Sequence, residues 1–138
     1  MLSSFKGTFK VVPGSAGAGS ISYRLRVVNN SGSACAFSRA PALLLLDRNG
    51  HALPSHATFP HPTSVTLNIA AGKAAIAQAR FSPDMPSGGE PQTGACEKRA
   101  FKLRIRTGPT NSVTIPVKPP TSVCGRGAMA FRAIHQGT

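Results

Sequence analysis

Three histidines recur at five-residue intervals in the segment HALPSHATFPHP, and their imidazoles could bind copper or zinc. At this spacing His51, His56 and His61 do not share one face of a strand, and the three prolines of the segment keep it extended. The segment contains no cysteine or acid that could complete a metal site. We therefore expect a solvated loop or edge strand with no metal or other cofactor, and a copper or zinc carrier is the alternative function.

Basic residues alternate with apolar residues along two segments and could bind anions. Arg24 and Arg26 alternate in YRLRV, and Lys102, Arg104 and Arg106 alternate in FKLRIR. If the two segments share a sheet, the five cations cover one face, where guanidinium groups can bind phosphates through paired hydrogen bonds. The alternative is an ordinary solvated face that discourages edge aggregation.

The net charge points to the same class of partner. Sixteen Lys and Arg against four Asp and Glu give +12 and a pI near 11.2. This balance favours nucleic acid, acidic lipid headgroups or phosphate-bearing wall polymers, although surface charge also accumulates without a partner. Nucleic acid lacks support, because the chain has no Trp and its one Tyr, Tyr23, is expected to point inward. An anionic cell-wall polymer or a membrane surface remains.

The acids offer no basis for enzyme chemistry. They are Asp47, Asp84, Glu90 and Glu97, and their spacing forms no pair for general acid and base catalysis. The sequence contains no Gly-x-Ser-x-Gly elbow and no His-Glu-x-x-His helix. We expect a protein that is not an enzyme.

Alternating apolar and polar residues recur along the chain and predict β-strands that each bury one face. The pattern covers residues 5–11, 23–27, 65–69, 101–106 and 113–117, and a last strand is expected over residues 128–134. Residues 74–80 are rich in alanine, which permits a helix. The flanking Gly72 and Pro83 and the alternation favour a strand instead.

Eight to ten short antiparallel strands predict an all-β fold, either a sandwich or a barrel. Turn signals at Asn30–Gly32 and Asn49–Gly50 separate the strands. Because no boundary or repeat divides the chain, we expect residues 1–138 to form one monomeric domain. The Pro- and Gly-rich residues 82–95 are predicted to form a long surface loop.

Membrane and export signals are missing from the sequence. The longest apolar run, residues 41–46, is far shorter than the roughly 18 residues of a membrane span. Residues 1–6 enter a strand-like pattern at once. The protein is therefore either cytoplasmic or exported by a segment that this sequence does not include.

Three cysteines allow three single-bridge pairings and leave one thiol over. Cys96 and Cys124 precede strands that we expect to be neighbours, which favours that pair. Cys35 follows the turn at residues 29–32 and is expected to begin a return strand with its side chain pointing inward. No His lies near it in sequence to lower the pKa of its thiol, which argues against a nucleophile.

The order of these signals resembles an actinobacterial family of exported domains of unknown function, family 4232. The resemblance rests on Gly14–Ser20, Val28–Gly32, Cys35–Phe37, Pro41, Leu44–Asp47, Gly50, Val65–Leu67, Ala71–Ala74, Gly94–Cys96, Phe101–Leu103 and Val123–Gly125. It implies an immunoglobulin-like β-sandwich outside the cytoplasm, commonly behind a signal peptide, a lipobox or a membrane anchor. It implies no activity.

One departure from this family concerns Cys35. The resemblance implies a further cysteine near the first strand, to which Cys35 would be bridged, but Ser3 and Ser4 stand in that neighbourhood. We therefore expect Cys35 to be a buried and unreactive thiol. Together these observations predict a non-enzymatic binding or structural module of the cell envelope.

Overall fold

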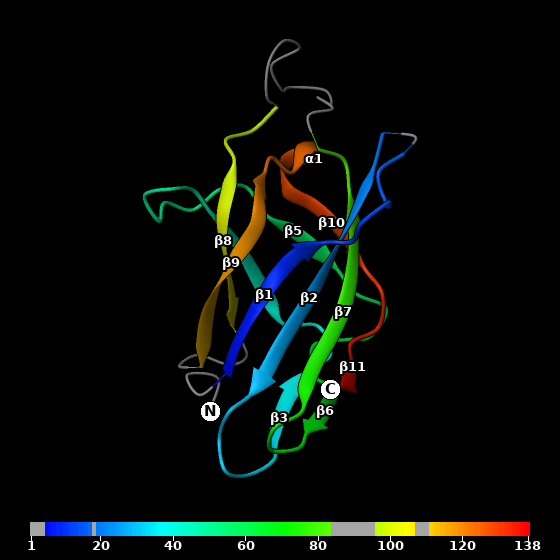
Figure 1. Ribbon diagram of the computed structural model, residues 1–138, viewed down its shortest axis with the longest axis vertical. Coiled ribbons are helices and arrows are strands. Elements are labelled where there is room, and N and C mark those ends of the chain that lie inside the picture. The colour runs from blue at the N-terminus through cyan, green and yellow to red at the C-terminus, as the bar shows by residue number, and fades with distance from the viewer. Residues whose placement is uncertain (1–4, 18, 84–95, 107–110) are drawn as a thin grey trace.

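The computed structural model describes residues 5–17, 19–83, 96–106 and 111–138 (Figure 1). The strands are β1 (Phe5–Val11), β2 (Ile21–Asn29), β3 (Cys35–Ser38), β4 (Ala42–Leu46), β5 (His56–Thr58), β6 (Thr66–Ile69), β7 (Ala74–Phe81), β8 (Ala100–Arg106), β9 (Ser112–Thr121), β10 (Ala128–Phe131) and β11 (His135–Gly137). The one helix of these residues, α1 (Cys124–Gly127), is a single turn, and no helix here is long enough to cross a membrane. Most of the predicted loop 82–95, and Ser3 and Ser4, lie outside the described residues.

Most strands belong to one sheet, whose order is β4-β8-β9-β1-β2-β7-β10-β5, with β11 paired to β7. This sheet is mostly closed and barrel-like, and β3 and β6 form a separate two-stranded sheet. The prediction of an all-β fold is confirmed. The described residues contain eleven strands rather than eight to ten, because the three-residue strands β5 and β11 are too short to show alternation.

The alternating pattern places the core where the sequence predicts it. On β2, Tyr23, Leu25 and Val27 are at most 1% exposed, while Arg24 and Arg26 between them face outward. The Tyr23 ring packs 5.1 Å from that of Phe9 on β1, measured between centroids. Its hydroxyl donates a hydrogen bond to the backbone oxygen of Pro119, at 2.8 Å. Burial raises the pKa of Tyr23.

Strand β1 joins the two halves of the sheet. It pairs antiparallel with β2 on one side and parallel with β9 on the other. Gly7 allows the close approach to β2, because a Cβ there would collide with the backbone oxygen of Arg26. No other strand of the described residues links β9 to β2, so the path of the sheet depends on β1.

Two strand predictions differ in outcome. The alanine-rich segment is the strand β7, as the sequence predicts, and its inward residues Ala75, Ala77 and Ala79 are buried. A single strand over residues 128–134 is wrong. The chain pairs as β10 and again as β11, while residues 132–134 between them belong to neither strand, although the Arg132 N–H still donates to the backbone oxygen of Gln78 on β7.

Asn29 fastens the end of β2 to the small sheet. Its side chain is fully buried, and its Nδ2 donates hydrogen bonds to the backbone oxygens of Ser33 and Ile69, each at 2.9 Å. Its Oδ1 accepts from the backbone N–H and the hydroxyl of Ser31. The turn therefore does not lead into a strand that returns along β2. Instead β3 begins at the buried Cys35 and pairs with β6.

The disulfide joins Cys96 to Cys124, the pair that the sequence favours, with a Cα–Cα separation of 5.6 Å. The cysteines are 28 positions apart, and closing a loop of this length in the unfolded chain stabilises the fold by about 3–4 kcal/mol in the chain-entropy treatment. Cys35 is free and 2% exposed.

We expect Asn29→Ala to lower the free energy of unfolding by about 2–4 kcal/mol, because it leaves several buried backbone groups without partners. The exposed neighbour provides the control, since Asn30→Ala should stay within about 0.5 kcal/mol of the wild type. Urea denaturation of both variants measures the difference. Equal losses would contradict the role assigned to Asn29.

We expect native, non-reduced protein to react with no thiol reagent, because its one free cysteine is buried. After denaturation without reductant, one thiol per chain should react, and peptide mapping should find the label on Cys35. Labelling of Cys96 or Cys124 under those conditions would refute the pairing.

Candidate anion-binding face

The five cations of the predicted stripe face outward from one sheet but fall into two groups. Arg24 and Arg26 lie on β2, while Lys102, Arg104 and Arg106 lie on β8. All are exposed except Arg104, which is half-buried. Figure 1 shows β9 and β1 side by side between these strands, so the two groups do not touch across neighbouring strands.

The intervening strands supply two lysines outside the predicted stripe. Lys10 of β1 lies opposite Arg24 of β2, and on its other side it lies in register with Lys118 of β9. All three side chains are exposed on the outer face. We call Lys118, Lys10 and Arg24 the basic row. The alternation of β1 already marks Lys10 as outward, but only the parallel pairing of β1 with β9 brings it beside Lys118.

The basic row is a costly arrangement for the fold alone. Directly opposed side chains on antiparallel strands have Cβ atoms about 4.5–5.5 Å apart, and like charges at that separation destabilise a sheet. Among the described residues, no carboxylate forms an ion pair with any member of the row. A bound anion would therefore relieve repulsion that the folded protein otherwise retains.

Unlike the side chains of the basic row, the Arg26 side chain donates hydrogen bonds within the described part of the protein. Its Nε–H and Nη2–H donate hydrogen bonds to the backbone oxygen of Thr138, at 3.2 and 2.8 Å. Because β11 lies on the far side of β7 from β2, the Arg26 side chain crosses β7 to reach this acceptor. A hollow of about 310 Å³ lies on the β1 side, lined by Thr8, Lys10, Val11, Val12, Pro13, Arg24 and Arg26.

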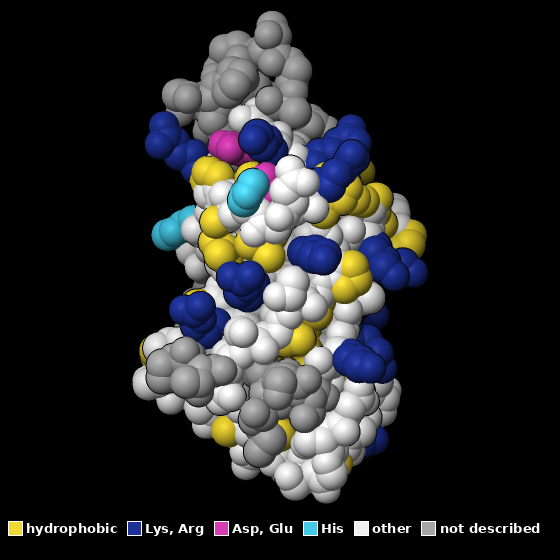
Figure 2. Space-filling model, turned by 90° about the vertical axis from the view of Figure 1, so that its left-hand side faces the viewer, with side chains coloured by type: hydrophobic (Ala, Val, Ile, Leu, Met, Phe, Trp, Pro, Cys, Tyr) yellow, Lys and Arg dark blue, Asp and Glu magenta, His cyan; other side chains and the backbone are white. Residues whose placement is uncertain are grey.

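The β8 group borders a separate, more apolar hollow of about 220 Å³, where Arg104 and Arg106 meet Leu43 and Leu44 of β4. Figure 2 views the molecule from the side on which β8 lies. Lys and Arg side chains are spread along the height of this side, whereas the acidic side chains that are described lie near one end. The positive charge therefore continues beyond the basic row.

The structure does not bring the three histidines together. His51 lies in the turn after β4, His56 begins β5, and His61 follows β5 in the connection to β6. All three are exposed, and no group of three or more His, Cys, Asp or Glu that could hold a metal occurs among the described residues. The structure therefore gives the alternative metal carrier no support at these positions, because the three rings lie in the turn after β4, on β5 and in the connection after β5.

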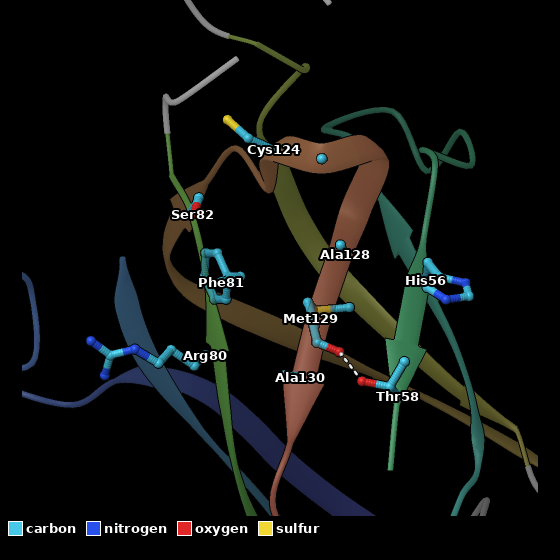
Figure 3. A pocket seen from close by; sticks show the side chains of 10 residues that line it. His56, Thr58, Arg80, Phe81, Ser82, Cys124, Ala128, Met129 and Ala130 are labelled. Atoms are coloured by element: carbon cyan, nitrogen blue, oxygen red, sulfur yellow. Dashed lines mark hydrogen bonds between the residues drawn. The ribbon is translucent and has the colours of Figure 1, made fainter. Parts of the chain in front are cut away.

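His56 instead borders a hollow of about 340 Å³ between β7 and β10 (Figure 3). Its imidazole points away from Phe81 and Met129, which line the interior. The hydroxyl of Thr58 donates to the backbone oxygen of Met129, at 3.5 Å. The sulfur of Cys124 is held in the disulfide, so this hollow has no thiolate nucleophile.

A family model described as a domain of unknown function (DUF4232) matches residues 3–134. No curated protein and no solved structure matches the chain.

Asp47 gives the histidine-bearing turn a pH dependence. The backbone N–H groups of His51 and Asn49 each donate to Asp47 Oδ1 at 2.9 Å, and they hold the pKa of this carboxyl below its usual value. The charged form therefore stabilises the fold above the unfolded pKa of about 3.9, and this contribution is lost as the pH falls through the folded pKa.

Asp47→Asn keeps an acceptor but removes this titration. We expect the wild type to exceed the variant in free energy of unfolding at about pH 6, and the gap to narrow toward about pH 3. Urea denaturation across that range measures it. If the difference in free energy of unfolding between wild type and variant grew as the pH fell, the role assigned to the charged form of Asp47 would be contradicted.

Proposed function

We propose that this chain, which belongs to the DUF4232 family, is a non-enzymatic module that binds an anionic polymer of the cell envelope through the outer face of its sheet. The observation that carries the proposal is the basic row, where Lys10 lies between Lys118 and Arg24 on three neighbouring strands. Three cations in neighbouring register positions, with no carboxylate pairing among the described residues, form a surface that an anion stabilises.

A polymer suits this face better than a membrane surface. Proteins that lie on bilayers combine basic residues with exposed large apolar side chains that enter the lipid. Within the described ranges, the exposed large hydrophobic residue is Val65, just before β6. The alternating pattern over residues 65–69 predicts that Val65 points inward with Leu67 and Ile69, but β6 begins only at Thr66. The outer face of β9, β1 and β2 offers charge without such an anchor.

Two observations support a location outside the cytoplasm. The disulfide between Cys96 and Cys124 persists in oxidising compartments and is rare in the cytosol. The resemblance to exported, often lipid-anchored actinobacterial domains points the same way. Export and surface anchoring are therefore part of this proposal.

An immunoglobulin-like sandwich is also part of it. Most strand pairs are antiparallel, and the two-stranded sheet of β3 and β6 lies apart from the main sheet. The barrel-like closure of the main sheet would then be this domain's elaboration of that architecture.

A sedimentation assay with matched charge variants tests the binding proposal. We expect the triple variant Lys10→Gln, Arg24→Gln and Lys118→Gln to lose pelleting with purified poly(glycerol phosphate). The slope of log affinity against log salt should become shallower by about 2–3, since roughly one counterion is released per neutralised charge.

The control variant also loses two lysines and one arginine, but at exposed positions outside the basic row: Lys73→Gln, Lys98→Gln and Arg99→Gln. It should pellet nearly as well as the wild type. Equal pelleting by the two triple variants would reject the basic row as the binding surface. Retention on phosphatidylglycerol vesicles but not on the polymer would assign the face to a membrane instead.

A further inference from the structure

The hollow beside the basic row owes its shape to two residues that lie opposite each other, Thr8 on β1 and Arg26 on β2. Thr8 has a short side chain. The long side chain of Arg26 is drawn across β7 by its two hydrogen bonds to Thr138. The outer face above Thr8 is therefore left open, although arginine and lysine side chains surround it.

The groups around this hollow are suited to donate hydrogen bonds. Lys10 and Arg24 lie opposite each other, two residues along their strands from the pair of Thr8 and Arg26 and therefore on the same face. Their ammonium and guanidinium groups can only donate hydrogen bonds. Thr8 is half-buried, and its hydroxyl has no hydrogen-bond partner among the described residues. An ammonium, a guanidinium fork and a hydroxyl are a donor set that fits a tetrahedral oxyanion.

One wall of the hollow carries no charge. Val12 and Pro13 follow the end of β1 and form this wall, and the Val12 N–H donates to the backbone oxygen of Ser22, at 2.9 Å, which fixes the wall against β2. An apolar wall beside cationic donors suits an anion with carbon substituents better than a free phosphate. A phosphodiester has both parts, since it combines one negative charge with two ester carbons.

We infer that the hollow above Thr8 is a binding site for a single phosphodiester group, with Thr8, Lys10 and Arg24 as donors and with Val12 and Pro13 against the ester carbons. The inference rests on the proposed function, because it names the repeating unit of the anionic polymer as a phosphodiester. Lys118 lies beside Lys10 in register and would meet a neighbouring unit of the same polymer.

Thr8→Val tests the site without changing any charge. We expect it to weaken binding of diglycerol phosphate, a small soluble phosphodiester, by about 5-fold, the loss typical of one hydrogen bond. The salt dependence should stay unchanged, and Thr8→Ser should bind like the wild type. Isothermal titration calorimetry measures the affinities, and equal melting temperatures show that the variants are folded. Equal affinity for Thr8→Val and the wild type would overturn the inference.

Two further variants separate a formed site from general attraction. Arg24→Lys keeps the charge but loses the planar fork, so it should weaken diglycerol phosphate binding by about 10-fold or more, the loss typical of one hydrogen bond to a charged group. Arg104→Gln removes a charge on β8 and should change it by less than about 2-fold. A larger effect from Arg104→Gln than from Arg24→Lys would assign binding to the general field of the face.

The two proposals can fail separately. If the wild type pellets with poly(glycerol phosphate) and Thr8→Val pellets equally at every salt concentration, the polymer-binding function stands and the phosphodiester site is rejected. If the wild type binds diglycerol phosphate with the Thr8 dependence but does not pellet with the polymer, the site stands and the polymer is rejected. Binding of inorganic phosphate more tightly than the diester would refute the assignment of the apolar wall.

Discussion

The parallel pairing of β1 with β9 is the contact on which the rest of the sheet depends. On one side of it stand β4, β8 and β9, and on the other stand β2, β7, β10 and β5, so β1 alone converts two small sheets into one nearly closed sheet. The connection is possible because Gly7 has no side chain to hold β1 away from the backbone of Arg26. Phe9 of the same strand packs its ring against those of Tyr23, Phe81 and Phe131, which anchors β1 from the inside.

The pairing of β1 with its neighbours both stabilises the core and brings together the charges of the outer face. Inward, β1 contributes Phe5 and Phe9, which are 2% and 0% exposed, and burial of such rings is worth roughly 1.5–3 kcal/mol each. Outward, it brings Lys10 between Lys118 and Arg24, where the three charges repel. Because successive residues of a strand face opposite ways, one register fixes both results. The hydrophobic gain can outweigh the repulsion, which leaves the outer face free to serve an anionic ligand.

The sequence is informative about faces and less so about neighbours. Alternation correctly assigns Tyr23 to the core and Arg24 to solvent, because the period of two depends only on local geometry. It does not show that Lys10 lies beside Lys118, since these residues are far apart in the chain and their pairing is decided by the whole fold. For the same reason it predicts the buried position of Cys35 but not the pairing of β3 with β6 through Asn29. The histidine spacing already argues against three rings on one strand face, and the structure adds that the three residues lie at separate places along β4, β5 and the connections beside them.

The alanines on the inner side of β7 have a consequence for the width of the barrel. Ala75, Ala77 and Ala79 are each at most 2% exposed and lie in the same core as the clustered aromatic rings. The alanine methyl groups leave room that longer side chains from the facing wall can fill. The distance between the two walls therefore depends on the small side chains of β7 as much as on the large side chains opposite them. A redesign intended to change the width of the interior would therefore begin at those three positions, because a larger side chain there would push the opposite walls apart.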